Sequence, residues 1–402
     1  MSEFKKFDLL ESIIEQVALK GYQEPTAIQK ECIPALIKGQ DVLGIAQTGT
    51  GKTAAFALPI INKFGKKKKA VKPKCVRSLI LTPTRELATQ IMENIDTYAQ
   101  GLNLKTRVVY GGVKKNKQVQ DISLGLDILV ATPGRLLDII SSGEIDFRQL
   151  EVFVLDEADT MLDMGFFNDV RSIVGHLPKV RQTALFSATM PPKIEALAQR
   201  ILKTPLKVEV APESTTVKLV EQKICLLVKA DKMPLLQKIL ENPEIETALI
   251  FCKTKMGSDI VADGLKELGI SAVSIHSDKT QNNRDEALQD FKDHKVRVLV
   301  ATDVAARGID VDNISLVVNY NLPEDPRNYV HRIGRTARAG KAGTAISFVV
   351  ENDIPVLKSI EENIGQTIPI DSDQPYHKAF KLIVKKTKAQ LKAKKKKKKK
   401  KK

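Results

Sequence analysis

Three carboxylates follow directly on an apolar run in VFVLDEADTML, residues 152–162. Asp156, Glu157 and Asp159 stand almost side by side there. Carboxylates this close repel one another, and they are costly beside buried surface unless a positive or hydrogen-bonding group compensates them. The segment therefore predicts a cation or a set of strong donors at this point of the chain.

A glycine-rich loop earlier in the chain predicts a phosphate site. AQTGTGKT, residues 46–53, follows the β-type run VLGIA and opens the helical pattern TAAFALPIINKF. This is the arrangement of a P-loop, with Ala46 where the first glycine usually stands. Gly49 and Gly51 let the backbone turn its N–H groups inward, and Lys52 can reach the β and γ phosphates of a nucleotide. The residues expected to hold the nucleotide are Ala46, Gln47, Thr48, Gly49, Thr50, Gly51, Lys52 and Thr53.

The acidic cluster supplies the part that a P-loop site still needs. Such a site takes an acid from the tip of a neighbouring strand, which holds Mg²⁺ together with the hydroxyl of the loop. Asp156 and Thr53 are the predicted metal ligands, and Glu157 is the predicted general base that orients and deprotonates the attacking water. Helix capping is a sufficient alternative for Asp159 alone. It does not explain Asp156 and Glu157 directly beyond a buried strand.

The elements that position these residues alternate between strand and helix patterns. Apolar runs of five or six residues, separated by amphipathic segments, are typical of strands buried on both faces of a parallel sheet. The alternation restarts after a stretch rich in Pro, Ser and Thr at 203–222, so we expect two tandem α/β domains. The expected strands are 42–46, 78–82, 127–131, 152–156 and 183–187, then 247–251, 296–301, 315–319 and 344–348.

Composition excludes several classes of protein. A charged fraction of 28% beside an apolar fraction of 43% is typical of a globular chain. No apolar run reaches the roughly 18–20 residues that a membrane span needs. The first residues show no apolar signal-peptide core, so we expect no export, and the four cysteines form no CxxC pair. We therefore expect a cytoplasmic protein with neither a zinc site nor a disulfide framework.

The net charge is concentrated at one end of the chain. Of the net +16, residues 381–402 contribute 14 lysines and no acid, which leaves +2 for the remainder. A block of like charges this dense cannot pack, so we expect a disordered basic tail that attracts polyanions without reading sequence. A second cluster, Lys66 to Lys69, is expected to be a solvated loop. Solubility alone is the alternative reading of both runs.

Several motifs, in order along the chain, resemble those of the DEAD-box ATP-dependent RNA helicases of superfamily 2. They are GYQEPTAIQ (21–29), AQTGTGKT (46–53), PTRELA (83–88), TPGR (132–135), DEAD (156–159), SAT (187–189), ATDVAARGID (301–310) and HRIGRTAR (331–338). Their order and spacing match the family over roughly residues 4–365. The text of DEADTMLDMGF and LFSATMP is most similar to the bacterial RhlE-type branch. The resemblance implies two RecA-like domains with parallel sheets, ATP between them and RNA across both.

The resemblance also implies further nucleotide-site residues. Gln29 is expected to read the adenine edge, Phe4 to stack on the base and Asp310 to contact the ribose. Arg335 and Arg338 are three positions apart and lie on one face if that segment is helical. They are expected to act as arginine fingers, which stabilise the charge that develops in phosphoryl transfer.

An RNA site and a coupling network are implied in the same way. Backbone-type donors with few aromatic residues favour contacts to phosphates and 2′-hydroxyls over contacts to base edges. Asp159 is expected to connect to the RNA side through Ser187 and Thr189, and His331 and Arg332 to join the network around the nucleotide. The predicted RNA contacts are Thr84, Arg85, Gly112, Thr132, Arg135, Gln281, Arg284, Thr302 and Asp303.

These patterns predict an ATP-dependent RNA helicase that uses Mg²⁺ and acts on single-stranded RNA and short duplexes. An ATP-gated RNA clamp with little turnover and a DNA or protein translocase are the alternatives. Ribonucleoprotein, degradosome and ribosomal partners stay open, and no membrane partner is expected. The expected boundaries are a Q-motif segment at 1–30, RecA-like domains at 31–205 and 221–370, a linker at 206–220 and a basic tail at 371–402.

Overall fold

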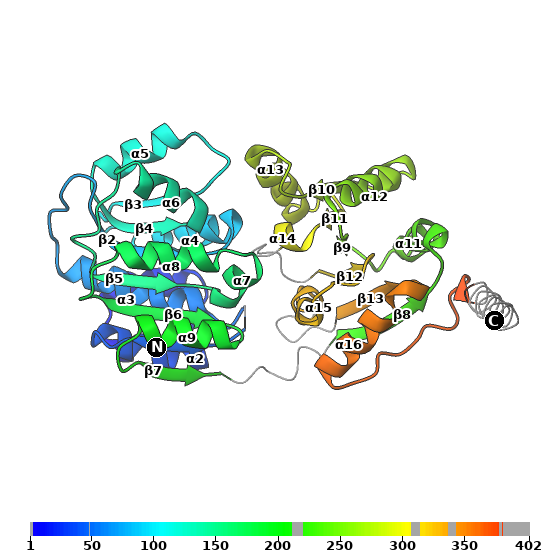
Figure 1. Ribbon diagram of the computed structural model, residues 1–402, viewed down its shortest axis with the longest axis horizontal. Helices are drawn as coiled ribbons and strands as arrows, with labels where there is room; N and C mark the ends of the chain where they lie inside the picture. Colours follow the sequence, from blue (N-terminus) through cyan, green and yellow to red (C-terminus); the bar gives the residue numbers. More distant parts are fainter. Residues whose placement is uncertain are drawn as a thin grey trace, which may run out of the picture. The chain divides into compact units, whose positions relative to one another are not determined.

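The chain divides into two compact units, Met1–Pro212 and Glu213–Lys402, which we call unit 1 and unit 2. The computed structural model describes residues 3–47, 49–210, 220–306, 314–336, 343–377 and 380. Each unit is built on one parallel sheet with helices on both faces (Figure 1). This confirms the expected fold class of two tandem α/β domains.

The sheet of unit 1 has seven parallel strands in the order β3-β4-β2-β5-β6-β1-β7. Side chains alternate between its two faces: Val154 packs into one apolar core with α1 to α4, while Phe153 and Leu155 pack into a second core with α6 to α9. The strands are β1 (Val42–Ile45), β2 (Val76–Leu81), β3 (Thr106–Val109), β4 (Leu126–Ala131), β5 (Val152–Leu155), β6 (Gln182–Ser187) and β7 (Leu206–Glu209).

The helices of unit 1 follow these strands in the βα alternation that parallel pairing requires. They are η1 (Glu3–Phe7), α1 (Glu11–Leu19), α2 (Ala27–Ile37), α3 (Lys52–Lys66), α4 (Arg85–Tyr98), α5 (Lys115–Ser123), α6 (Pro133–Ser141), α7 (Ala158–Asp163), α8 (Phe167–His176) and α9 (Pro192–Ile201). Among the described residues of the whole chain, no helix is both long and apolar enough to cross a membrane.

Unit 2 repeats the plan with six parallel strands in the order β10-β11-β9-β12-β13-β8. The strands are β8 (Val220–Leu226), β9 (Ala248–Phe251), β10 (Ala272–Ile275), β11 (Val298–Ala301), β12 (Leu316–Asn319) and β13 (Gly343–Val349). The helices are η2 (Lys229–Asp231), α11 (Lys232–Leu240), α12 (Lys255–Glu267), α13 (Gln281–Lys292), α14 (Asp303–Ala306), α15 (Pro326–Ile333), η3 (Glu351–Asp353) and α16 (Ile354–Ile364).

The ordered elements reach beyond some of the expected boundaries. Residues 206–209, expected in the linker, form β7 and pair with β1. Residues 371–377, expected in the tail, pack on unit 2, where Asp371 N–H donates to Ile224 O (2.8 Å) and Gln374 Nε2 donates to Leu226 O (2.8 Å). The lysine run from 381 onward lies outside the described residues.

Candidate nucleotide and RNA site

The carboxyl edge of the unit 1 sheet brings the predicted motifs of that unit together. In a parallel sheet all strands end at one edge, and ligands bind in the loops beyond it. The P-loop follows β1, PTRELA follows β2, the pair Gly111 and Gly112 follows β3, TPGR follows β4, DEAD follows β5, and SAT spans the end of β6. Motifs spread over more than a hundred residues of sequence therefore share one edge of one unit.

The P-loop has the backbone that its glycines predict. Gly49 and Gly51 have φ angles of 87° and 90°, in the left-handed region that favours glycine. A Cβ on Gly51 would lie 2.4 Å from Gln29 Nε2. Lys52 is buried, and its Nζ donates to Ala46 O at 3.0 Å across the loop. Thr50 Oγ1 donates to Gln47 O at 2.8 Å, while Thr48 lies outside the described residues.

The acidic cluster holds a buried carboxylate at Asp156 and an unusual backbone conformation at Glu157. Asp156 is 2% exposed, and this burial raises its pKa to about 7, with Glu157 adding to the shift and Lys52 opposing it. Glu157 has φ 52° and ψ 53°, a left-handed conformation that costs a non-glycine residue on the order of 1 kcal/mol. Such outliers cluster at active sites but also occur elsewhere in this chain, as at Lys74 and His294, so the role of Glu157 as the base stays a prediction.

The same cluster passes a chemical test for Mg²⁺. The pKa of the buried Asp156 carboxylate stays above its ordinary value although Lys52 lowers it, so its charge is only partly compensated, and a bound cation would supply the rest. The described residues hold no group of three His, Cys, Asp or Glu side chains that could bind a metal by themselves. Mg²⁺ is usually held by one or two protein ligands, waters and substrate phosphates. Asp156 and Thr53 are the residues that would hold it.

Asp159 makes the contacts predicted for it with SAT. Thr189 donates to Asp159 Oδ2 from both its backbone N–H (2.8 Å) and its Oγ1 (2.9 Å). Asp159 N–H donates to Ser187 Oγ at 3.2 Å, and Ser187 Oγ donates to Thr189 O at 2.7 Å. The Asp159 carboxylate is thus bound by Thr189 and the Asp159 N–H by Ser187, and Asp159 lies in the first turn of α7.

Gln29 and Phe4 are engaged by protein groups in the structure. Gln29 Oε1 accepts from Thr26 N–H (3.0 Å) in a capping box that begins α2, and Gln29 Nε2 donates to Gly51 O (3.1 Å). Gln29 therefore lies at the P-loop, with its amide turned to the loop backbone, and its contact to the adenine edge stays a prediction. Phe4 is 1% exposed within the core, edge to face with Phe7. Its ring is covered by protein, so stacking on a base requires the N-terminal segment to move.

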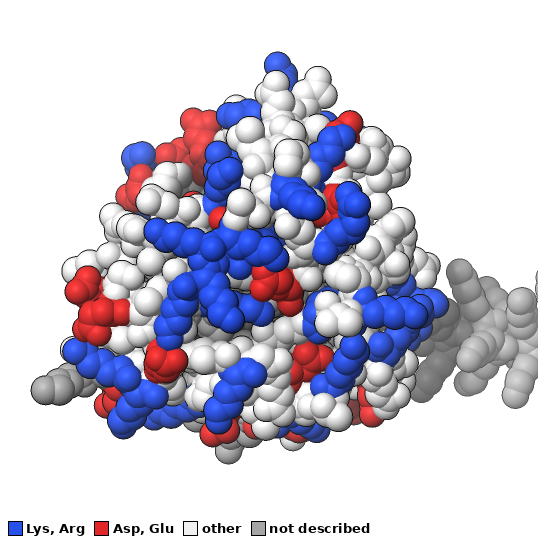
Figure 2. Space-filling model, turned by 90° about the vertical axis from the view of Figure 1, so that its left-hand side faces the viewer, with Lys and Arg blue, Asp and Glu red and all other residues white. Residues whose placement is uncertain are grey.

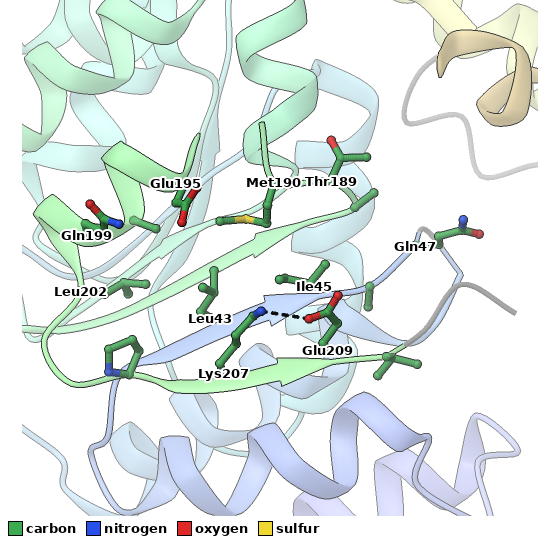
Figure 3. A pocket seen from close by; sticks show the side chains of 15 residues that line it. Leu43, Ile45, Gln47, Thr189, Met190, Glu195, Gln199, Leu202, Lys207 and Glu209 are labelled. Atoms are coloured by element: carbon green, nitrogen blue, oxygen red, sulfur yellow. Dashed lines mark ion pairs between the residues drawn. The ribbon is translucent and has the colours of Figure 1, made fainter. Parts of the chain in front are cut away.

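A separate cavity of about 660 Å³ lies beside the P-loop and SAT (Figure 3). It is bounded by β1, β7 and α9, and its lining is mostly apolar, with Leu43 and Ile45 at its floor. Its charged groups are Glu195 and the ion pair of Lys207 with Glu209 (2.9 Å). Lys52 and Asp156 are not among its lining residues, and a triphosphate would meet two carboxylates there. The cavity is therefore not the nucleotide site.

Three predicted RNA contacts of unit 1, Arg85, Gly112 and Arg135, meet at residues 110–118, which run from the end of β3 into the first turn of α5. Arg135 donates to Gln118 Oε1 (2.7 Å) and to Val113 O (3.0 Å). Arg85 lies against Gly112, where a Cβ would come within 2.2 Å of Arg85 Nη1 and where φ is 87°. Glycine at 112 thus serves both the turn and the close approach of the guanidinium. Thr84 and Thr132 begin α4 and α6, and the Thr84 hydroxyl accepts from Leu87 N–H (3.3 Å).

The predicted RNA contacts of unit 2 stand at the carboxyl edge of its own sheet. Gln281 and Arg284 lie on the first turn of α13, beyond β10, and both are buried. Thr302 follows β11, and its carbonyl accepts the N–H groups of Ala305 and Ala306. These positions agree with the plan of unit 1, in which loops after the strand ends carry the candidate contacts.

Asp303 and Arg332 form a pair that the sequence did not predict. Arg332 donates to both Asp303 oxygens (2.5 and 2.7 Å), to Asn319 Oδ1 (3.0 Å) and to Asn321 O (2.7 Å). Arg332 is 2% exposed and its donors are used within unit 2, and its place in the network around the nucleotide stays a prediction. Both carboxylate oxygens of Asp303, a predicted RNA contact, are likewise bound by the Arg332 guanidinium. No local pattern signals the pair, because its members stand 29 positions apart.

The arginine fingers are described only in part. The helix α15 ends at Ile333, so Arg335 lies in the turn beyond it, buried, with its N–H donating to Arg332 O (3.2 Å). A continuous helix through 335 is therefore not formed. His331 is half-buried in the last turn of α15. Arg338 and Asp310 lie outside the described residues.

Sequence reasoning missed a clamp on the segment that leads into α13. Asp259 of α12 accepts from Ser274 Oγ (2.6 Å), meets His276 Nε2 at 3.0 Å and pairs with Lys279 Nζ at 2.9 Å. Burial alone would raise its pKa, yet the hydrogen bonds from Ser274, Lys279 and His276 hold that pKa well below its usual range. A lone Asp on an amphipathic helix gives no sequence signal of this role.

Comparisons with known proteins agree with these motifs. Residues 26–197 match the family model of the DEAD/DEAH box helicases, and residues 231–340 match that of the helicase conserved C-terminal domain. The chain is 41% identical over 362 residues to the ATP-dependent RNA helicase CshA of Listeria monocytogenes, across 90% of this chain and 69% of that protein. It is 41% identical over 359 residues to the DEAD-box ATP-dependent RNA helicase CshA of Streptococcus pneumoniae, across 89% of this chain and 68% of that protein.

Solved structures give the same picture. Dbp5 of S. cerevisiae bound to RNA and ADP BeF3 is 30% identical, with a TM-score of 0.81 over 95% of this chain and 100% of that one. Mss116 bound to ssRNA and UDP-BeF is 29% identical, with a TM-score of 0.81 over 91% of this chain and 78% of that one. With its motifs on the carboxyl edges of two RecA-like units and with relatives that cover most of its length, the chain belongs to the DEAD-box RNA helicase family.

Proposed function

We propose that the protein is an ATP-dependent RNA helicase that couples ATP hydrolysis to local unwinding or remodelling of RNA. The observation that carries this proposal is the shared carboxyl edge of unit 1, where P-loop, acidic cluster and candidate RNA loops occur side by side in one sheet. A site that binds nucleotide and polynucleotide on one edge can make each depend on the other through the loops between them.

The chemical roles follow from the positions of the side chains. Lys52 is poised over the loop on Ala46 O and can exchange this acceptor for phosphate oxygens. Glu157, held in a left-handed conformation beside Asp156, is the base that takes the proton of the attacking water. Mg²⁺ held by Asp156 and Thr53 would neutralise charge on the phosphates. Arg335 and Arg338 of unit 2 are proposed to stabilise the transferring phosphoryl group, which makes hydrolysis depend on both units.

Coupling to RNA is proposed to run through Asp159. Its bonds to Ser187 and Thr189 join the helix that follows the catalytic acid to the loop after β6. Binding of ATP and RNA together would favour a closed state in which the loops of unit 1 bend one strand, and hydrolysis would release it. Contacts by Thr84, Arg85, Gly112, Thr132 and Arg135 would be to the sugar–phosphate backbone, so recognition is largely independent of sequence.

The finer assignments are proposals with different support. Relatives named CshA cover about nine-tenths of the chain, which favours a CshA-like branch over the RhlE-type branch expected from two short motifs. Cytoplasmic location is proposed from the four reduced, buried cysteines. Ribonucleoprotein or degradosome partners fit a helicase that recognises backbone, but no residue singles out one of them.

The test is RNA-stimulated ATP hydrolysis and unwinding of a short duplex by the full chain. Glu157→Gln keeps size and the metal ligands but removes the base, so we expect turnover to fall by about 10²–10⁴-fold. Glu267→Gln, an exposed residue of α12, is the matched control and should leave turnover unchanged. Stimulation by DNA but not by RNA would refute the assignment. Wild-type turnover that stays as low as that of Glu157→Gln would identify the ATP-gated clamp instead.

A further inference from the structure

A lysine-rich segment stands at the opposite edge of unit 1 from the candidate site. It connects the end of α3 to the start of β2, and Figure 2 faces the end of unit 1 where the strands begin. Lys67, Lys68, Lys69 and Lys72 are exposed there. Within the described part of the chain, none of these four side chains is paired with a carboxylate, although Lys66 pairs with Asp8 and Lys74 with Glu144. Their charge is thus available to an external anion.

The backbone of this segment is fixed by contacts to three other parts of unit 1. Arg77 Nη2 donates to Lys67 O (3.4 Å), Lys72 N–H donates to Gln149 Oε1 (2.8 Å), and Cys75 N–H donates to Lys72 O (3.0 Å). Gly125 approaches so closely that a Cβ on it would lie 2.7 Å from Lys72 O, and its φ is 72°. The segment is therefore held at Lys67 and at Lys72, and Lys68 and Lys69 lie exposed between these two points, as expected for a solvated loop.

Neighbouring groups reinforce the positive charge of the turn. Lys105 is exposed and reaches Leu124 O (3.2 Å), next to Gly125, so it borders Lys72. The acids of this end are already matched: Asp127 meets the buried Arg77 guanidinium at 2.9 Å, and Asp146 meets Arg148 at 2.6 Å. Figure 2 shows Lys and Arg side chains gathered across the middle of this face, with acids interspersed. We call Lys67, Lys68, Lys69, Lys72 and Lys105 the lysine surface.

We propose that the lysine surface is a second RNA-binding surface, which holds the phosphate backbone of duplex RNA at the edge of unit 1 remote from the ATP site. Lysine is a flexible point charge suited to phosphates, and it is depleted in the cores of protein–protein interfaces. Leu124 is exposed here, but a single apolar side chain gives a protein partner little to bury. The proposal rests on the proposed function, because it requires RNA at the other edge.

The separation of the two edges sets the kind of RNA that can reach both. A strand rises about 3.3 Å per residue, and β2 alone has six residues, so the edges are at least about 20 Å apart. A single strand of about 5 nucleotides spans about 17 Å at the stacked spacing of about 3.4 Å per nucleotide, which is less than this separation. A substrate with a single-stranded end and a duplex of about 16 base pairs, which spans two successive minor grooves, can occupy both edges. The lysine surface should therefore matter only for the longer substrate.

The test compares the quadruple variant Lys67→Gln, Lys68→Gln, Lys69→Gln, Lys72→Gln with the control Lys193→Gln, Lys229→Gln, Lys238→Gln, Lys358→Gln in the full chain. The control lysines are also exposed and lack carboxylate partners in the described residues. We expect the first variant to bind the tailed duplex about tenfold more weakly, with the slope of log K against log salt reduced by about 0.9 for each lost phosphate contact. Its affinity for the short single strand and its RNA-stimulated turnover on that strand should be unchanged.

A second measurement tests whether RNA covers the side chains of the lysine surface. Acetylation of lysines with and without the tailed duplex, located by mass spectrometry, should show protection of Lys67 to Lys72 and no protection of Lys229, Lys238 or Lys358. Unchanged duplex affinity, or no protection, would overturn the proposal. Protection of these lysines by poly-glutamate but not by duplex RNA would also overturn the proposal. It would indicate that the lysine surface binds an acidic protein. Loss of RNA-stimulated hydrolysis in the wild-type chain would instead refute the proposed function, since duplex binding is measured without turnover.

Discussion

Asp259 shows how one side chain can set the geometry of a distant contact. It joins Ser274 and His276, at the end of β10, to Lys279, just before α13. Gln281 and Arg284, both predicted RNA contacts, begin that helix. Asp259 is thus a positioning residue, because it acts on RNA only through the segment it clamps.

Asp259→Asn is expected to destabilise the protein at neutral pH by about 1–2 kcal/mol, since the hydrogen bonds to a charged acceptor weaken but the carboxylate is 37% exposed and screened. The pKa of Asp259 is lowered in the folded state, so its contribution is present above the ordinary pKa near 3.8 and is lost as pH falls below it. Wild-type stability should therefore converge with that of the variant on acidification. Urea denaturation followed by circular dichroism between pH 3 and pH 7 measures this.

Asp263→Asn, on the same helix, is the control for Asp259→Asn. Its partner Lys266 is on the surface, and such pairs contribute little. A positioning role also predicts that Asp259→Asn raises the RNA concentration needed for half-maximal ATP hydrolysis while leaving the maximal rate in place. If Asp259→Asn and Asp263→Asn changed that RNA concentration equally, the positioning role of Asp259 would be contradicted.

The positions of single residues were predictable where the chemistry is local to a motif, and the roles assigned to them stay predictions. Asp156, Glu157, Lys52 and Thr53 follow from a loop and a strand tip whose required residue types are known. Arg332 and Phe4 did not follow, because their surroundings come from remote parts of the sequence. Arg332 is held by Asp303 and Asn319, and Phe4 by the core of unit 1.

At the scale of elements, the start of α2 and the P-loop are joined by the side chain of Gln29. Gln29 accepts from Thr26 N–H at the start of α2 and donates to Gly51 O in the loop. A contact between the helix start and the loop means that the loop backbone can respond to whatever the amide binds. The adenine contact predicted for Gln29 would then be exchanged with the contact to Gly51.

Gln29→Glu is expected to weaken ATP binding by about 5–20-fold, because the carboxylate keeps the acceptor for Thr26 but loses the donor and faces Gly51 O unpaired. The effect should be larger for ATP than for a bare triphosphate, since only ATP offers an adenine edge. Isothermal titration of both ligands measures the difference. Gln40→Glu, an exposed change in the same unit, should bind like wild type. Equal losses for ATP and triphosphate would restrict Gln29 to supporting the loop.

The elements themselves divide into those the sequence pattern reveals and those it does not. All nine expected strands are present, and they are the inner strands of the two sheets. The four strands that were missed, β3, β7, β8 and β10, are the four sheet edges. An inner strand of a parallel sheet is buried on both faces and gives a continuous apolar run, as in β5. An edge strand such as β7 is mostly exposed, so its sequence, LKVE, is indistinguishable from a linker.

At the scale of the whole molecule, three of the four cysteines can be used to follow the opening of the two units separately. Cys32 is buried in unit 1, whereas Cys225 and Cys252 are buried in unit 2. Burial raises the pKa of each of these three thiols to about 12. Their ionisation therefore opposes folding only as pH rises above the ordinary value near 9.0, and at pH 8 they should react only when their unit opens.

Thiol labelling at pH 8 can thus test whether ATP and RNA engage both units. A ligand at a hundred times its Kd stabilises the state that binds it by about 2.7 kcal/mol, which slows labelling through opening by about 100-fold. We expect ATP and RNA together to slow the labelling of Cys32 and also of Cys225 and Cys252, because the proposed arginine fingers come from unit 2. Arg335→Ala should remove much of the slowing at Cys225 and Cys252 and leave that at Cys32. Slowing confined to Cys32 in the wild-type chain would mean that the nucleotide and RNA engage unit 1 alone, and the proposed dependence of hydrolysis on unit 2 would be wrong.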